Sequence, residues 1–464
     1  MASLFSLLAL FVFSALHYSS CVNGGETHSR FHSITLDSLQ PSDTCSSMPT
    51  ALDGNRLPIV HRHGPCSPFT NRRKINHKQT LRHDLARVNS LHRKHSVSKK
   101  KDVTSRFSTN VTIPDRVGLP LSTMDYIVTV GYGTPTKNFS VIFDTGSDIS
   151  WIQCKPCVGE CYPQHDQLFD PSQSSTYANV SCSSDDCSLI GGTCDTSNVC
   201  IYTVQYGDGS YSAGFFAQET LTLTPSSILK KFEFGCGELN QGLFGSVAGL
   251  IGLGRNKVSL ASQASPVYGK AFSYCLPEFN GTTGFLTIGA QQQYPGVKFT
   301  PMLTNPSYPS FYFVELIGIS VGGHNLSIPP TVFASPGTII DSGTVLTYLP
   351  PTAYSALRDK FRSLMTSYKM APPFDILDTC YDFRGESVII IPALELQFGG
   401  GVTLEISFSG TLLSLSPSQT CLTFVPTQSD DEFSIIGNLQ QRSTEVVYDL
   451  ENEMIGFGPE LSCS

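Results

Sequence analysis

From Tyr126 onward, apolar residues form short runs that glycine and proline interrupt. Runs of about four to eight apolar, β-branched and aromatic residues between turn residues are typical of strands. The clearest runs lie at 126–130, 140–143, 221–223, 311–319 and 445–448. The chain also has 39 Gly and 29 Pro, and only 15% of its 464 residues are charged. We therefore expect an all-β fold with a few short helices.

Two segments show helical periodicity instead. The clearest one covers 353–366, follows two prolines and carries apolar side chains on one face at Leu357, Phe361 and Leu364. The other lies nearer the N-terminus, and its apolar positions are Leu81, Leu85, Val88 and Leu91. Arginines and lysines surround that second segment, which predicts a short amphipathic helix.

Charge divides the chain into a basic leader and an acidic body. Residues 22–119 contain 16 Lys and Arg against 7 Asp and Glu, a charge of +9, which leaves −17 for the rest of a chain of net charge −8. We place the boundary near Leu119-Pro120 and call residues 24–119 the leader segment and 120–464 the body. We expect the leader segment to cover an acidic cleft and to dissociate when the body's carboxylates are protonated. A solvated linker and a nucleic-acid patch around Lys99–Lys101 are the alternatives, and a basic run without interleaved aromatics disfavours the second.

The first 23 residues have the features of a signal peptide. An uncharged apolar run from Leu4 to Leu16 precedes small and polar residues. A membrane anchor is the alternative, but this run is shorter than the roughly 20 residues of a spanning helix. We expect a protein without a membrane anchor that is secreted to the extracellular space or apoplast.

The cysteines agree with export. Twelve of the fifteen lie from Cys154 onward, and an even set in an exported chain suggests disulfides. Sequons for N-glycosylation, which the secretory route allows, occur at Asn110, Asn138, Asn179, Asn280 and Asn325.

A repeated motif indicates two related lobes. Phe143-Asp144-Thr145-Gly146-Ser147 recurs as Ile340-Asp341-Ser342-Gly343-Thr344, with the aspartates 197 positions apart. An apolar motif ending in glycine follows each aspartate, 108 positions later at Gly252 and 96 positions later at Gly437. A lone triplet of this kind is an ordinary turn, but two copies in matched order are not explained by turns. We expect an N lobe at 120–305 and a C lobe at 306–464.

Histidine placement excludes several catalytic classes. Of the eleven histidines, only His165 and His324 lie in the body, and neither is in a nucleophile motif. A Ser/His/Asp or Cys/His mechanism and a His-rich zinc site are therefore unsupported. Acid and base groups must come from carboxylates, and no metal or other cofactor is implied.

Paired carboxylates can supply both groups. Two carboxyls within hydrogen-bond distance share a proton, so that one is a base while its partner is an acid. We assign this role to Asp144 and Asp341, without a separate role for each because the pair titrates as a unit. The charged member deprotonates water while the protonated member hydrogen-bonds the scissile carbonyl. Around the pair, glycine allows close backbone approach and hydroxyls hold the carboxylates, which adds Gly146, Ser147, Gly343 and Thr344.

From Tyr126 to Ser464 the chain resembles the pepsin-like aspartic proteases. In that family a tryptophan follows the first aspartate motif, matched here by Trp151, the only tryptophan. The flap of the family is matched by Tyr206-Gly207-Asp208-Gly209. The resemblance implies a bilobal fold with the active site between the lobes, and a Tyr206 that closes over substrate and hydrogen-bonds toward Trp151.

Seven cysteines between 154 and 200 make the chain similar to the plant nepenthesin-like subgroup. A zinc site at Cys154, Cys157 and Cys161 is the alternative reading of the first three. The subgroup's pattern implies pairing of Cys154 with Cys157, Cys161 with Cys236, Cys182 with Cys200, Cys187 with Cys194, Cys275 with Cys463, and Cys380 with Cys421.

The leader segment carries a further resemblance. Residues 59–66 are similar to relatives of a tobacco chloroplast-nucleoid DNA-binding protease, which raises plastid and DNA-binding hypotheses. The apolar N-terminus is secretory in character and does not resemble a transit peptide.

Together these features predict a secreted aspartic endopeptidase, made as a zymogen and active at acidic pH. We expect protein or peptide substrates, a monomer, and the protein's own leader segment as inhibitor. The alternatives are a catalytically silent inhibitor or binding protein of the same fold, and a DNA-associated plastid protease. The vacuole is an alternative location.

Overall fold

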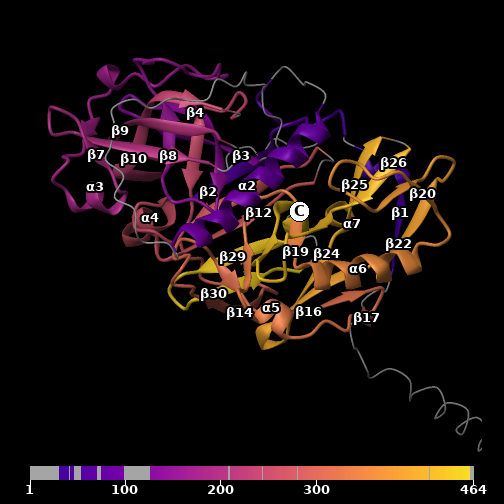
Figure 1. Ribbon diagram of the computed structural model, residues 1–464. Coiled ribbons are helices and arrows are strands. Elements are labelled where there is room, and N and C mark those ends of the chain that lie inside the picture. Colours follow the sequence, from indigo (N-terminus) through magenta and orange to yellow (C-terminus); the bar gives the residue numbers. More distant parts are fainter. Residues whose placement is uncertain are drawn as a thin grey trace, which may run out of the picture.

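The computed structural model is predominantly β-structure, arranged as two lobes (Figure 1). It describes residues 31–40, 42–45, 54–69, 75–98, 126–206, 209–242, 244–278, 281–416 and 418–459, with side chains of the first helix up to Arg93. The expected signal peptide lies outside these residues.

The N lobe consists mainly of antiparallel strands, with a long hairpin at its centre. The hairpin is formed by β9 and β10. Phe232 and Phe234 of β10 lie on one face and join the main core, whereas Phe216 of β9 lies on the opposite face in a separate buried cluster. The predicted strands at 126–130, 140–143 and 221–223 are confirmed, each inside a longer strand. The strands are β3 (Tyr126–Tyr132), β4 (Lys137–Asp144), β5 (Trp151–Gln153), β6 (Ala178–Asn179), β7 (Thr193–Cys194), β8 (Cys200–Gln205), β9 (Tyr211–Thr224), β10 (Ser227–Gln241) and β11 (Gly249–Gly252).

The C lobe has a central group of strands and two four-stranded sheets. The central strands are β15 (Phe313–Val314), β18 (Thr338–Ile340), β19 (Thr347–Leu349), β27 (Phe424–Pro426) and β28 (Ser434–Ile436). One sheet has the order β17 (His324–Asn325), β16 (Leu316–Val321), β23 (Leu394–Phe398), β24 (Val402–Ile406). The other has the order β20 (Lys369–Ala371), β21 (Cys380–Asp382), β26 (Gln419–Leu422), β25 (Leu412–Ser416).

The strand predicted at 311–319 is divided in two. β15 pairs with β18, whereas β16 pairs with β23 in another sheet. The chain changes sheet at Glu315, so one apolar run serves two sheets. The strand predicted at 445–448 is confirmed as β29 (Glu445–Asp449).

A sheet shared by both lobes lies beneath them. Its order is β2 (Arg56–His61), β13 (Gly284–Ile288), β12 (Ala271–Cys275), β29, β30 (Met454–Phe457) and β14 (Lys298–Leu303). β12 precedes the expected lobe boundary at 305 yet pairs with β29 from the end of the chain. Phe272 and Tyr448 stack between these two strands with ring centroids 4.3 Å apart, so the lobes share a core here.

The leader segment is part of this fold. β1 (Phe31–Thr35) pairs with β22 (Val388–Pro392) in the C lobe, and β2 lies between β13 and β3. α2 (His77–Ser98), indigo in Figure 1, crosses between the two lobes. The helix predicted there is confirmed but is long, and Leu81, Val88 and Leu91 are its buried apolar residues.

The helix predicted at 353–366 is α6 (Pro351–Leu364). It begins two residues earlier because proline suits the first helical position, where its missing N–H is not needed. Among the described helices none is long and apolar enough to cross a membrane. The other helices are short: α3 (Asp185–Leu189), α4 (Leu260–Tyr268), α5 (Thr331–Ala334), α7 (Phe408–Thr411) and the 3-10 turns η1 (Leu36–Leu39), η2 (Pro171–Gln173), η3 (Gly399–Gly401) and η4 (Asn438–Gln441).

The disulfides correct four of the implied pairs. The structure joins Cys154 to Cys236, Cys157 to Cys161, Cys182 to Cys194 and Cys187 to Cys200, in place of Cys154–Cys157, Cys161–Cys236, Cys182–Cys200 and Cys187–Cys194. For the first pair, strand pairing is the physical reason. Cys236 lies opposite Ile152 in β5, two residues from Cys154, and the Cys154 N–H donates to Gly237 O in the same ladder at 2.8 Å.

The remaining cysteines have three outcomes. Cys380 and Cys421 lie directly opposite each other in β21 and β26 and are bonded, as the resemblance implied. Cys463 lies outside the described residues, so the implied pair with Cys275 is not described. Cys45 and Cys66 of the leader segment form a disulfide that sequence analysis did not predict.

Sequon exposure is consistent with modification at three sites. Asn138, Asn179 and Asn325 are exposed. Asn110 and Asn280 lie outside the described residues.

Candidate active site

Asp144 and Asp341 end equivalent strands in the two lobes. Asp144 is the last residue of β4, which runs parallel to β11, and Asp341 follows β18, which runs parallel to β28. The next strand in the N lobe, β5, runs antiparallel to β11, and the next strand in the C lobe, β19, runs antiparallel to β28. The repeated motif therefore produces the same local topology twice, and this topology brings the two aspartates together.

Each carboxylate is held in the same way by its own loop. It accepts one hydrogen bond from the glycine N–H two residues later and one from the hydroxyl three residues later. For Asp144 the distances are 2.9 Å from Gly146 N and 2.7 Å from Ser147 Oγ, and for Asp341 they are 3.0 Å from Gly343 N and 2.6 Å from Thr344 Oγ1. These are the contacts expected of the four residues around the pair.

The two glycines are needed for close approach of the loops. A Cβ at Gly146 would lie 2.7 Å from Asp341 Oδ1, and one at Gly343 would lie 2.2 Å from Asp144 Oδ1. Any side chain at either position would therefore push the opposite carboxylate away.

The middle residues of the two triplets link the loops across the site. Thr145 N–H donates to Ser342 Oγ at 3.1 Å, and Ser342 N–H donates to Thr145 Oγ1 at 2.9 Å. Both side chains are buried. Sequence analysis did not select them, although a hydroxyl residue at the same place in both triplets was the available signal.

The flap lies where the resemblance implied. Tyr206 follows β8, and β8 and β9 form the hairpin that carries it. The buried Trp151 donates its indole N–H to the Tyr206 hydroxyl at 2.8 Å. Gly209 has φ +87, which suits a tight turn at a glycine. Gly207 and Asp208 lie outside the described residues.

Arg87 of α2 reaches between the two aspartates. Its Nη2 donates to Asp144 Oδ1 at 2.8 Å and to Asp341 Oδ2 at 3.0 Å, and its Nε donates to Thr344 Oγ1 at 3.3 Å. Sequence analysis counted Arg87 among the charges of the amphipathic helix but did not assign it to the site. Arg87 lies two residues after Leu85 and four before Leu91, and this place in the apolar pattern gave no sign that its side chain points at the two aspartates.

The surroundings move the pKa values of the two carboxyl groups in opposite directions. For Asp144, burial raises the pKa, but the Arg87 charge and the hydrogen bonds from Ser147 and Gly146 outweigh burial and lower it. For Asp341, burial and the negative charge of Asp144 outweigh Arg87 and leave the pKa raised. This separation is the condition under which one carboxyl is charged while the other holds a proton.

A second contact of α2 lies one turn before Arg87. The buried Asp84 accepts hydrogen bonds from the N–H groups of Val345 at 2.7 Å and Leu346 at 3.0 Å, and from the Tyr348 hydroxyl at 3.1 Å. These groups directly follow the second aspartate loop. The leader segment therefore satisfies backbone donors of the cleft as well as its carboxylates.

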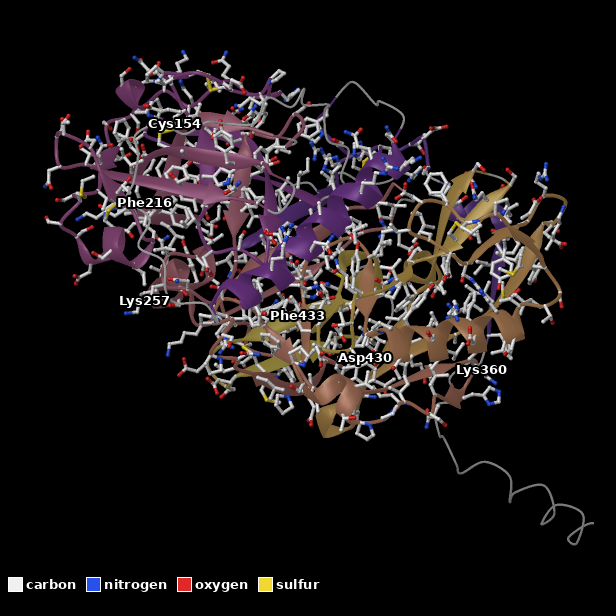
Figure 2. All side chains as sticks on the ribbon, in the orientation of Figure 1. Cys154, Phe216, Lys257, Lys360, Asp430 and Phe433 are labelled. Carbon is white, nitrogen blue, oxygen red and sulfur yellow. A yellow bond between two sulfur atoms is a disulfide. The ribbon has the colours of Figure 1, made fainter. Side chains whose placement is uncertain are left out.

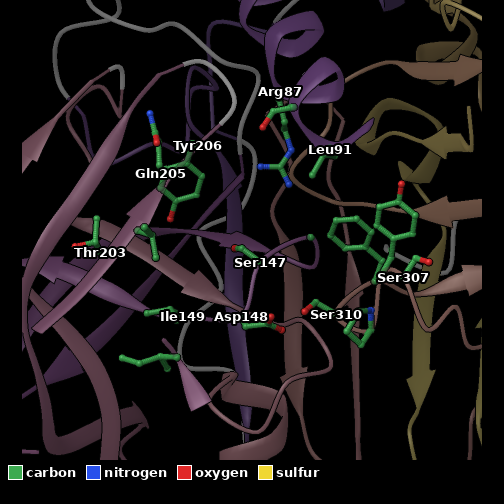
Figure 3. A pocket seen from close by; sticks show the side chains of 17 residues that line it. Arg87, Leu91, Ser147, Asp148, Ile149, Thr203, Gln205, Tyr206, Ser307 and Ser310 are labelled. Carbon is green, nitrogen blue, oxygen red and sulfur yellow. The ribbon is translucent and has the colours of Figure 1, made fainter. Parts of the chain in front are cut away.

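A cavity of about 410 Å³ lies beside the pair (Figure 3). The segments that line it are residues 146–149, Ile190 and 203–206 from the N lobe, 307–311 from the C lobe, and Arg87, Ser90 and Leu91 from α2. In Figure 3, Arg87 and Leu91 enter from above between Tyr206 on one side and Ser307 on the other. The leader segment thus forms part of the wall of a cleft between the lobes.

The zinc hypothesis is wrong for this chain, because the sulfurs of Cys154, Cys157 and Cys161 are all in disulfides. Within the described residues no group of three or more His, Cys, Asp or Glu side chains could hold a metal ion.

Comparison with known proteins places this site in a family. A model described as xylanase inhibitor N-terminal matches residues 126–290, and one described as xylanase inhibitor C-terminal matches residues 311–459. An aspartyl protease family protein of Arabidopsis thaliana is 45% identical over 456 residues, 96% of each chain. Aspartic proteinase nepenthesin-2 of Nepenthes gracilis is 38% identical over 345 residues, 72% of this chain and 77% of the relative.

Solved structures agree on the fold. The crystal structure of edgp has a TM-score of 0.63 at 21% identity and covers 73% of this chain and 92% of its own. Basic 7S globulin from soybean has a TM-score of 0.60 at 21% identity, with coverage of 73% and 94%. The chain belongs to the pepsin-like aspartic proteases, hydrolases of the plant nepenthesin-like subgroup.

Proposed function

We propose that the protein is a secreted aspartic endopeptidase, made as a zymogen and active at acidic pH, in which Asp144 and Asp341 activate water to cut peptide bonds. The observation that carries this proposal is the symmetric pair with the Arg87 guanidinium between its carboxylates. The pair supplies the chemistry, and Arg87 occupies the place of substrate and water.

The geometry supports general acid and base catalysis without a covalent intermediate. The charged carboxyl takes a proton from water as the water oxygen attacks the scissile carbonyl carbon, while the protonated carboxyl donates to the carbonyl oxygen. In the resulting diol, a proton passes to the leaving nitrogen and the carbon–nitrogen bond breaks. Hydrogen bonds from Ser147 and Thr344 keep both carboxylates oriented through these steps.

The leader segment inhibits this site by direct contact. α2 lies over the pair, Arg87 neutralises it, and Asp84 takes the backbone donors beside it. Leu81, Val88 and Leu91 pack in one apolar cluster with Tyr308, Phe311 and Phe433 of the C lobe. Substrate cannot enter until the helix leaves.

Acid is expected to weaken this inhibition. Arg87 lowers the pKa of Asp144 in the bound state, so that contact is intact above the ordinary carboxyl pKa and is lost as the pH falls through the lowered value. Burial lowers the pKa of His92, which lies against Phe433 O at 3.0 Å and Glu432 at 3.4 Å (Phe433 is labelled in Figure 2). Its contribution is present above the ordinary pKa of about 6.5 and is lost below it.

The pH dependence of the Asp84 contact is opposite to that of the Asp144 and His92 contacts. Burial raises its pKa to about 7, against the hydrogen bonds from Val345, Leu346 and Tyr348. Its contribution to leader binding is therefore present at low pH and is lost as the pH rises through about 7. Asp84 thus strengthens leader binding as the pH falls and opposes the loss at His92, so release should be completed only in the carboxyl range, where the Arg87 contacts fail.

Hydrolysis by the purified full-length chain tests the proposal. After acidification to about pH 4 we expect cleavage of denatured globin, blocked by pepstatin, and we expect little cleavage at pH 7. Leader release followed by gel electrophoresis should accelerate between pH 7 and pH 4. A rate unchanged over that range would contradict acid activation or point to processing by another protease.

A catalytically silent inhibitor of the same fold is the second candidate. The two matching family models, both described as xylanase inhibitor, favour considering it. The intact hydrogen-bonded pair favours an enzyme instead. Lack of turnover at every pH after leader removal, together with stoichiometric inhibition of a xylanase, would favour the inhibitor.

Secretion is supported by the apolar N-terminus, the disulfides and the exposed sequons. Plastid location and DNA association have less support, because two arginines of the leader segment, Arg62 and Arg87, are committed to contacts with the body.

A further inference from the structure

A second arginine of the leader segment, Arg62, is buried against the N lobe. Arg62 follows β2 and is only 4% exposed. Its Nη2 donates to the Phe244 carbonyl oxygen of the N lobe at 2.7 Å. A buried guanidinium is costly unless the protein provides groups shaped for it.

The body leaves room for this guanidinium at a glycine. Gly245 has φ +64, and a Cβ built on it would lie 1.4 Å from Arg62 Nη2. A side chain of any size at this position is therefore incompatible with the bound arginine. The Phe244 carbonyl and the space above Gly245 together form a notch, which we call the Gly245 notch.

The Gly245 notch adjoins the aromatic residues that position the flap. The Phe244 ring lies edge-on to Trp151, with centroids 4.8 Å apart, and edge-on to Tyr206 at 5.5 Å. Trp151 in turn hydrogen-bonds Tyr206. A contact that fixes the Phe244 backbone thus acts on the group that holds the flap tyrosine.

Other residues of the leader segment join the same cluster. Val60 and Phe69 pack against it, and the Phe69 ring lies 5.5 Å from that of His165. Tyr162 belongs to the cluster too: burial raises its pKa well above the ordinary value, and the nearby Arg62 charge opposes that rise. The leader segment is thus attached on the flap side as well as at the aspartates.

We propose that the Gly245 notch is a guanidinium-binding site of the N lobe, filled by Arg62, that anchors the leader segment to the flap cluster independently of Asp144 and Asp341. This rests on the proposed function, and it adds a second site of control. The leader segment must vacate both sites before the flap is free.

The two anchors differ in their response to acid. Protonation of the carboxylates removes the partners of Arg87, whereas a guanidinium and a carbonyl oxygen do not titrate between about pH 3 and pH 8. His61, next in the chain, is buried, and its pKa is lowered well below the ordinary value by burial and by His63, Arg442 and Arg62, so its contribution is present above about pH 6.5 and is fully lost only as the pH falls through that lowered value. Acid should therefore release α2 before it releases the segment around Arg62.

Retention of a cut leader segment tests this order. A site-specific protease sequence is inserted between residues 99 and 125 of the full chain, the chain is cut at pH 7, and leader retention is followed by size-exclusion chromatography. We expect the Arg87→Ala chain to retain its leader segment after cutting at pH 7. Arg62→Ala should speed leader loss at least tenfold, and Arg62→Lys, which keeps the charge, should speed it less.

Substitution on the body side supplies the matched controls. Gly245→Ala fills the notch and should also speed leader loss, whereas Gly191→Ala, with φ +65 and nothing within 4 Å, controls for backbone strain alone. Because Arg62→Ala removes the clash, the Arg62→Ala/Gly245→Ala chain should lose its leader no faster than Arg62→Ala. Additive effects, or retention equal to the parent chain in both single variants, would overturn the proposal.

Trp151 reports on the flap cluster directly, because it is the only tryptophan. In the uncut chain, Arg62→Ala should raise acrylamide quenching of its fluorescence, whereas Arg82→Ala, on the exposed side of α2, should not. Unchanged quenching in Arg62→Ala would contradict the link to the flap. Neither readout requires substrate hydrolysis, so an inactive protein would refute the proposed function without affecting this test.

Discussion

Replacement of Asp144 or Asp341 by Asn is expected to lower kcat for peptide hydrolysis by about 1000-fold or more. Asn has the shape of Asp but can neither take a proton from water nor give one to a carbonyl, and positioned proton transfer alone contributes about 10² to 10⁴. Both variants should lose activity to a similar degree, because the two carboxyls act as one unit. The measurement is steady-state hydrolysis of a quenched fluorescent peptide at about pH 4 with the leader removed.

Asp430→Asn is the matched control for this pair. Asp430, labelled in Figure 2, accepts hydrogen bonds from Thr352 N–H at 3.0 Å and from Thr352 Oγ1 at 2.6 Å at the start of α6. Its activity should equal that of the parent chain, and circular dichroism should show that all three variants fold. Full activity in either dyad variant would refute the assignment of Asp144 and Asp341.

Replacement of Arg87 by Ala is expected to free the active site at neutral pH without an acid step. Loss of one partner from a buried ion pair costs about 3 to 5 kcal/mol. The aspartates can take up a proton when Arg87 is gone, so we expect the lower end, which is about 100-fold in occupancy of the cleft by α2. Binding of the uncut chain to immobilised pepstatin at pH 6.5 measures that occupancy.

Arg82→Ala is the control on the same helix. Arg82 pairs with Asp375 at 3.1 Å, but 63% of its side chain is exposed, and exposed pairs contribute about 0 to 1 kcal/mol. The Arg82→Ala chain should therefore bind pepstatin as weakly as the parent chain. If Arg87→Ala also binds as weakly as the parent chain, Arg87 is not what closes the site.

Features that depend on local sequence were predictable. The strands at 126–130 and 445–448 follow from short apolar runs, and α2 follows from Leu81, Val88 and Leu91. The dyad was predictable because each triplet contains a glycine and is followed by a hydroxyl residue, and both bond the aspartate from within three residues. Such contacts depend only on residues next to each other in the chain, so the local sequence is enough to predict them.

Disulfide pairing shows where prediction failed. Cys154 and Cys157 are close in sequence, yet Cys154 is bonded to Cys236, 82 positions away. The partner was decided by the parallel pairing of β5 with β10, a long-range arrangement that cysteine order does not contain. Cys380 and Cys421 were paired correctly from the resemblance, and they too are strand neighbours.

The repeated aspartate motif, the basic leader segment and the periodicity of α2 were determined by the sequence alone, because each depends on residues close together in the chain or on total charge. Only the tertiary structure decided that Arg87 lies between Asp144 and Asp341, that Thr145 and Ser342 link the loops, and that Arg62 fills the Gly245 notch. Each of these contacts joins residues 57 or more positions apart. Their partners are chosen by how sheets and lobes pack in space, and that information is absent from any local pattern.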